Sequence, residues 1–174
     1  MISKMADINT AIKNLSSLAD DKIKHLKDIL SITYKQKEVI EKQDIDMLTE
    51  YVAEKQKHID IIDSLDQKFE VIYQNIRDEL GYSEYSNEQS QQLIRFDEGN
   101  YTGKLYKELR GKIQEAQDIM KNIFELEKEN NKKANQIMEN LKEKIRAINV
   151  GQKSYKAYKN TAPLTDGIYI DKKR

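Results

Sequence analysis

The side chains of this chain that are best suited to metal chemistry are its two histidines, and the sequence contains no cysteine. In helical bundles, half of a di-metal site is often a Glu three residues before a His on a core-facing turn. The residues three before His25 and His58 are Lys22 and Lys55, so neither histidine completes this motif. Metal sites need clustered donors at fixed spacing. We therefore predict that each histidine lies on a solvated helix face, and we expect no metal or other cofactor.

Other catalytic motifs are also missing from the sequence. The six glycines stand singly, so they form neither a phosphate-binding loop nor a Gly-x-Ser-x-Gly turn. Without cysteine there is no thiolate nucleophile. Carboxylates such as Glu125 and Glu129 interleave with lysines such as Lys128 and Lys132 at helical spacing, which is typical of a solvated helix face. We expect a protein that is not an enzyme and has no catalytic residues.

The charge balance argues against two further classes of partner. Lys plus Arg and Asp plus Glu number 30 each, so no overall cationic field attracts nucleic acid. No apolar run approaches the roughly 20 residues that span a bilayer, and the first residues lack a signal-peptide core, so we expect a cytoplasmic protein without membrane insertion. Residues 151–174 nevertheless carry six basic and two acidic side chains, a local net charge of +4.

The elements that must position any binding residues are long helices. Apolar residues recur every three or four positions through residues 3–41, 44–80 and 103–149, which predicts three amphipathic helices. Asp44 is a suitable N-cap, because its carboxylate can accept from the free N–H groups of a new helix. The break at 41–44 is too short for a domain boundary. It predicts an antiparallel hairpin turn, with a kink in one long helix as the less favoured alternative.

Residues 81–102 form the main connection, since Ser, Asn, Gln, Gly and Tyr dominate there. A short connecting helix from Ser86 to Phe96 fits within it. The fold prediction is therefore all-α, an antiparallel bundle of three long helices over residues 1–150. A non-helical C-terminal tail is expected over residues 151–174, because Pro163 and the glycines there oppose helix formation.

The tail and the tyrosines carry the strongest hint of binding. The sequence Ile168-Tyr169-Ile170 is unusual for a solvated tail, since disordered segments are poor in β-branched and aromatic residues, so it looks like a docking element. Tyr155 and Tyr158 suit a surface that is apolar on one side and wet on the other. An equally good explanation is that these tyrosines cover the ends of the bundle.

Several segments together resemble the FlgN family of flagellar export chaperones. They are the long first helix, the junction Gln43-Asp44-Ile-Asp-Met-Leu48, the stretch from Asn131 through Asn135 to Leu141, and the closing Gly167-Ile-Tyr-Ile-Asp-Lys-Lys173. The ending is similar to the clostridial and bacillus-type branch of the family. The resemblance implies a cytoplasmic type III secretion chaperone that binds the helical C-terminal segments of the hook-filament junction proteins FlgK and FlgL. It also implies docking on the flagellar export apparatus.

A binding role of this kind agrees with the apolar patterning. An amphipathic helix of a partner could complete an underfilled bundle face, with the third helix as one wall. Polar residues in an apolar seam can fix the register of such a partner, although solvent-facing filler is the alternative for them. The candidate partner-binding residues are Asn130, Asn131, Asn135, Met138, Leu141, Ile145, Tyr155, Tyr158, Ile168, Tyr169 and Ile170.

The competing hypothesis is a structural coiled-coil protein whose apolar stripes pair with a second copy, giving a homodimer. Sustained heptads have a mean spacing of 3.5 residues. The stripe of the third predicted helix drifts toward about 3.6 residues, which favours a nearly straight helix over a supercoiled pair. The sequence therefore favours a chaperone over an oligomerisation protein.

Overall fold

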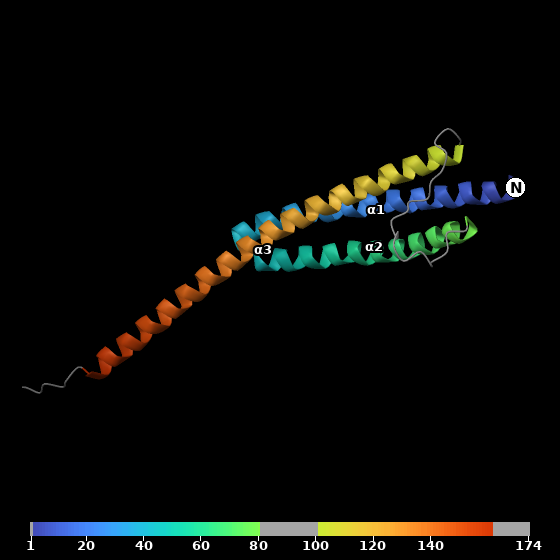
Figure 1. Cartoon of the computed structure of the whole chain (residues 1–174). Coiled ribbons are helices and arrows are strands. Elements are labelled where there is room, and N and C mark those ends of the chain that lie inside the picture. Colours follow the sequence, from blue (N-terminus) through green and yellow to red (C-terminus); the bar gives the residue numbers. More distant parts are fainter. Residues whose placement is uncertain (1, 81–100, 162–174) are drawn as a thin grey trace, which may run out of the picture. The chain divides into compact units, whose positions relative to one another are not determined.

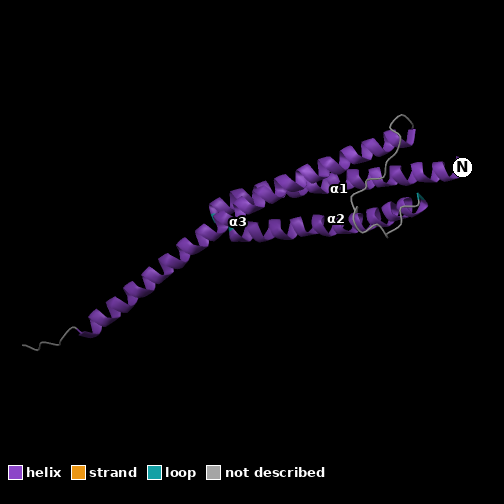
Figure 2. Ribbon diagram, in the orientation of Figure 1, coloured by secondary structure: helices purple, strands orange, loops and turns teal. Residues whose placement is uncertain are grey.

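The computed structural model describes residues 2–80 and 101–161, and these residues form three α-helices with no strand among them (Figure 2). Helix α1 spans Ile2–Lys42, α2 spans Ile45–Glu79, and α3 spans Tyr101–Thr161. The all-α expectation with three long helices is confirmed. The short helix expected at 86–96 and the chain beyond residue 161 lie outside the described residues.

The chain divides into two compact units, Met1–Asn131 and Lys132–Arg174. The first unit contains α1, α2 and the part of α3 up to Asn131, which lie side by side in Figure 1. The second unit contains the rest of α3. Each unit is described by itself below.

A tight turn joins α1 to α2, as predicted. Gln43 follows the last residue of α1 with a φ of 58°, in the left-handed region. The N–H groups of Gln43 and Asp44 donate to the carbonyl oxygens of Ile40 and Val39, at 3.1 and 2.9 Å, which is the pattern of a Schellman motif. Asp44 then caps α2, because its carboxylate accepts from the N–H of Met47 at 3.1 Å. The turn therefore ends one helix and starts the next within two residues.

The directions of the helices follow from the pairs that link them. Lys22 pairs with Asp66 of α2, whereas Gln36, later in α1, pairs with Lys55, earlier in α2, so α1 and α2 are antiparallel. Thr102, at the start of α3, pairs with Asn9 of α1, and Asn130, later in α3, pairs with Thr33, later in α1. Helices α1 and α3 are therefore parallel. The first unit is thus an up-down-up bundle, which confirms the predicted topology.

Two apolar clusters form the core of the first unit, and both draw residues from all three helices. Helix α1 supplies half of their buried members, more than α2 or α3, because its apolar face contacts both neighbours. The first cluster contains Ile8, Ile12, Leu15, Ala19, Ile76, Tyr106 and Leu109, and the second contains Ile23, Leu26, Ile29, Ile62, Ala116, Ile119 and Ile123. Burying these residues is the main force that holds the bundle together.

The predicted end of the third helix is wrong. The expectation placed it near residue 149 and assigned residues 151–174 to a non-helical tail, but α3 continues to Thr161. A Cβ added at Gly151 would meet no atom within 4 Å, so this glycine sits at an open helix position. A glycine there costs about 1 kcal/mol relative to alanine, which a long helix tolerates. The helix ends two residues before Pro163, the stronger breaker.

Candidate functional site

Asn130 of α3 is an interior residue of the first unit. Only 5% of its surface is exposed, and its side-chain Nδ2 donates to the carbonyl oxygen of Thr33 in α1 at 3.0 Å. Among the described residues, no donor reaches its Oδ1 atom. The amide of Asn130 therefore links α1 to α3. Of the two roles that the sequence left open for this residue, solvent-facing filler is wrong, and its buried amide is not displayed to a partner.

A buried lysine joins all three helices near the same level of the bundle. Lys55 of α2 donates to Gln36 of α1 at 3.1 Å and forms an ion pair with Glu127 of α3. A buried charge is tolerated only when it is paired and hydrogen-bonded, and both conditions are met here. The hydrophobic periodicity of the sequence does not predict this contact, because a lysine is expected on the solvated face of a helix.

In the second unit, a stripe of apolar side chains lies on one face of α3 and is exposed. Ala134 and Ile137 are half-buried, and the four larger residues that follow are exposed. We call these four, Met138, Leu141, Ile145 and Ile148, the apolar stripe. Their spacing of three and four residues places them on one face of the helix. An exposed apolar surface of this kind is a candidate interaction site.

The charges of the second unit are arranged around this stripe. Residues 132–161 contain eight basic and only two acidic side chains. With about 3.6 residues per turn, Lys142 and Lys144 fall on the two flanks of the stripe, whereas Glu143 falls on the opposite face. Lys142 forms an ion pair with Glu139 at 2.7 Å, so Lys144 is the flanking cation without a described carboxylate partner. The stripe is therefore an apolar surface with a cationic border.

The structure places the other predicted binding residues unevenly. Asn131, the last residue of the first unit, and Asn135 are both exposed, and so is Tyr155. Tyr158 lies within α3, and the orientation of its side chain is outside the described part of the structure. The closing triplet Ile168, Tyr169 and Ile170 also lies outside the described residues.

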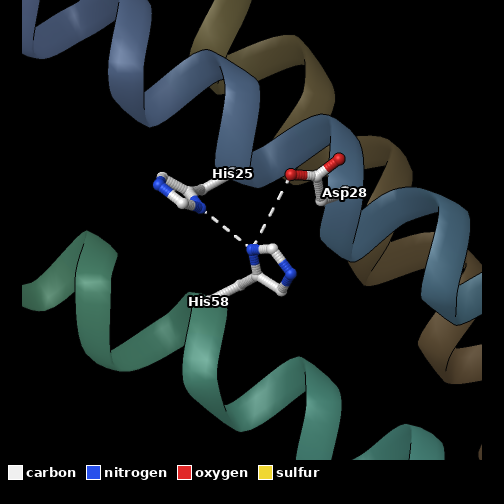
Figure 3. A group of neighbouring side chains, drawn as sticks. All are labelled: His25, Asp28 and His58. Carbon is white, nitrogen blue, oxygen red and sulfur yellow. Dashed lines mark hydrogen bonds and ion pairs between the residues drawn. The ribbon is translucent and has the colours of Figure 1, made fainter.

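The two histidines face each other across α1 and α2 (Figure 3). The Nδ1 atoms of His25 and His58 are 2.9 Å apart, and the Nδ1 atom of His58 is 3.8 Å from Oδ2 of Asp28. All three side chains are half-buried. The sequence predicts a solvated helix face for each histidine, whereas the structure places both at the interface of α1 and α2. His25 lies 18 residues before Gln43, and His58 lies 14 residues after Asp44. An antiparallel hairpin brings such positions close together, so their distances from the turn are the feature of the sequence that indicates this contact.

Ion pairs on the surface of the first unit reinforce the parallel pairing of α1 and α3. Lys112 binds Asp20 at 2.6 Å, and Lys27 binds Glu115 at 2.8 Å. The hydrogen bond to Asp20 raises the pKa of Lys112 above its usual value, with partial burial opposing and the charges of Asp20 and Glu108 adding to the effect. These pairs lie near the surface, so their role is mainly to favour one register of the two helices.

The described helices contain no segment that combines the length and the apolar character needed to span a bilayer. Comparisons with curated proteins and with solved structures gave no match. The family described as FlgN protein matches residues 5–163, nearly the whole chain. The bundle, the exposed stripe and the family resemblance seen in the sequence agree with this match. The chain belongs to the FlgN protein family.

Proposed function

We propose that this protein is a cytoplasmic chaperone of flagellar type III export, and that its clients are the hook-filament junction proteins FlgK and FlgL. Membership of the FlgN family supports the chaperone role. The observation that carries the proposal is the exposed apolar stripe of α3, from Met138 to Ile148. In this proposal the stripe receives the helical C-terminal segment of a client before export.

An amphipathic helix is the natural occupant of such a surface. A helix recognises an apolar helix face through residues spaced three and four apart, which is also the spacing of the stripe. Before assembly, a client's own apolar helix face is exposed and prone to aggregate. Covering that face with the stripe removes apolar surface from water on both proteins, and this burial drives the association.

The cationic border of the stripe indicates the chemistry of the client segment. Lys144 flanks the stripe, Lys142 on the other flank is paired with Glu139, and basic residues outnumber acidic ones in residues 132–161. A client helix with acidic residues beside its apolar face would therefore be favoured over a basic one. Pairs at such a rim contribute little affinity, but they speed association and reject like-charged partners. The client affinity should therefore weaken as the salt concentration rises.

Further contacts are proposed for the residues around the stripe. Asn135 and Tyr155 are exposed in the second unit and could extend the client surface beyond the two ends of the stripe. Asn131, exposed at the end of the first unit, is also assigned to partner binding. We also assign Tyr158 and the segment Ile168-Tyr169-Ile170 to partner binding, either to the client or to the export apparatus.

The test is co-expression of the full chain with FlgK and, separately, with FlgL, followed by purification of the chaperone. Co-purification of either client with the full chain is expected. A second form ending at Val150 keeps the stripe, so it should retain the client if the stripe is the main site and lose it if residues 151–174 carry binding. Absence of both clients from the full-chain preparation would refute the proposed clients.

A second copy of the chain is the competing occupant of the stripe. Light scattering of the isolated protein distinguishes a client from a second copy. If the stripe binds a client, the isolated chain should be monomeric at micromolar concentration. A stable dimer that dissociates when Leu141 and Ile145 are made polar would show that the stripe serves self-association instead.

A further inference from the structure

We propose that His25, Asp28 and His58 form a binding site for one divalent transition-metal ion, represented by Zn²⁺, that joins α1 to α2. Each residue offers one ligand atom, and these atoms all lie within 4.8 Å of one another. His25 and Asp28 come from consecutive turns of α1, and His58 faces them from α2 (Figure 3). The inference is independent of the proposed chaperone function.

The distances are close to those that a bound ion requires. With metal–ligand bonds of about 2.0–2.1 Å and tetrahedral angles, neighbouring ligand atoms are roughly 3.3 Å apart. The two Nδ1 atoms are separated by 2.9 Å, and Nδ1 of His58 lies 3.8 Å from Oδ2 of Asp28. An ion would therefore need the imidazoles to part by a few tenths of an ångström and the carboxylate to approach His58 by about half an ångström. The ligand atoms of His25 and Asp28 lie within 4.8 Å of each other, so this pair would close by at most about 1.5 Å.

The donor set determines the class of ion. Imidazole nitrogens suit Zn²⁺ and neighbouring transition metals, whereas Mg²⁺ and Ca²⁺ prefer sites made of oxygen alone. In the contact between the two Nδ1 atoms, one nitrogen donates a proton and the other presents a lone pair, so at least one ring already offers a ligand electron pair. Binding of the ion would replace that shared proton, and the donor ring would carry its proton on Nε2 instead.

The surroundings of the three residues favour a defined site. The helical neighbours Ile29 and Ile62 are buried in the second apolar cluster, so the two backbones that carry the ligands are held by packing. The three ligand side chains are half-buried, which leaves one side open for entry of the ion. Three protein ligands leave a fourth position for water or for a group from a partner.

The composition of the chain makes the test direct. The sequence contains two histidines and no cysteine, so neither a third imidazole nor a thiolate competes for the ion. The full chain is prepared without a histidine tag and titrated with Zn²⁺ by calorimetry, while the imidazole ¹⁵N signals are followed by NMR. One ion per chain should bind, and the signals of both rings should shift together. Tetrahedral Co²⁺, measured by its visible absorption, provides a second probe on the unmodified protein.

The variants His25→Gln and His58→Gln each remove one ligand, and Asp63→Asn removes an exposed carboxylate of α2 outside the cluster as the matched control. Each histidine variant should weaken Zn²⁺ binding at least about tenfold, since even the loss of an outer partner of a metal ligand has this effect. The control should bind like the unmodified chain. If a histidine variant fails to fold, the NMR and Co²⁺ titrations of the unmodified protein decide the matter. Absence of binding, or shifts confined to one ring, would overturn the proposal and leave a simple hydrogen bond between the histidines.

Discussion

Replacing Leu141 and Ile145 together by glutamine should weaken client binding about 10- to 150-fold. Burying a whole Leu or Ile side chain contributes about 1.5–3 kcal/mol. In the free protein 45% of Leu141 and 57% of Ile145 is exposed, so about half of each residue remains to be covered by a client. The pair then contributes about 1.5–3 kcal/mol, which corresponds to the stated change in Kd. Glutamine is chosen because it keeps helix propensity close to that of leucine.

The assay is calorimetric titration of a peptide from the C-terminal segment of FlgK into each variant of the full chain. The matched control is Val52→Gln with Val71→Gln on α2, because these valines are 54% and 62% exposed. Helix content by circular dichroism should be the same in all three proteins. If the unmodified chain binds and the Leu141 and Ile145 variant binds within about threefold of it, burial of the stripe does not drive recognition and the reasoning is refuted.

Three further predictions concern the stability of the first unit. Leu109→Ala should destabilise the bundle by about 2–5 kcal/mol in chemical denaturation, because Leu109 is fully buried and alanine leaves a cavity; a loss below about 1 kcal/mol would contradict the described core. Gln43→Gly should raise the unfolding free energy by about 0.5–1 kcal/mol, since glycine relieves the left-handed φ of 58°, and a loss of stability would show that the turn adopts another conformation. Lys112→Met should cost about 0.2–1 kcal/mol at neutral pH, because the paired ammonium is lost. Pairing with Asp20 raises the pKa of Lys112, so this cost should be fully present below the usual value of 10.5 and should disappear as the pH rises through the raised pKa; a cost that persists there would refute the ion-pair explanation.

The hairpin between α1 and α2 could be predicted from local signals. Asp44 is a good N-cap, and the apolar pattern slackens just before it. Both signals depend only on the residues next to the turn, so they can be recognised without knowledge of the rest of the fold. The left-handed conformation of Gln43 was not predictable, because glycine and asparagine are the usual residues at that position and glutamine is not.

The sequence predicts too early an end for α3, because the apolar pattern stops at Ile148 and Gly151 follows. Gly111, however, lies within the same helix, and neither glycine is crowded. A single glycine costs a helix about 1 kcal/mol, whereas an interior proline costs about 3 kcal/mol. Residues 152–161 contain no proline, so the first strong stop in the sequence is Pro163.

The pairing of His25 with His58 and the burial of Lys55 cannot be predicted from periodicity, for the same physical reason. Periodicity assigns a face to each residue on its own helix, but it does not say which residue stands opposite on the neighbouring helix. That information requires the register of the hairpin, which is fixed by the turn at Gln43 and by packing of the apolar clusters. The contact of a polar side chain therefore becomes visible only when the register is known.

The same apolar pattern on α3 has two different consequences along the helix. Up to Leu126 it includes buried residues such as Leu109, Ile123 and Leu126, although Met120 is 48% exposed. The four residues of the apolar stripe, Met138, Leu141, Ile145 and Ile148, are all exposed. Helix α3 has 61 residues and α1 has 41, so α1 is too short to pack along the whole apolar face of α3. Hydrophobic periodicity is the same whether a helix packs against its own chain or against another protein. The lengths of the packed helices are what distinguish these two cases. In the proposed function, a client's amphipathic helix would cover the apolar stripe, because its four side chains are exposed in the second unit and are spaced for contact with a helix.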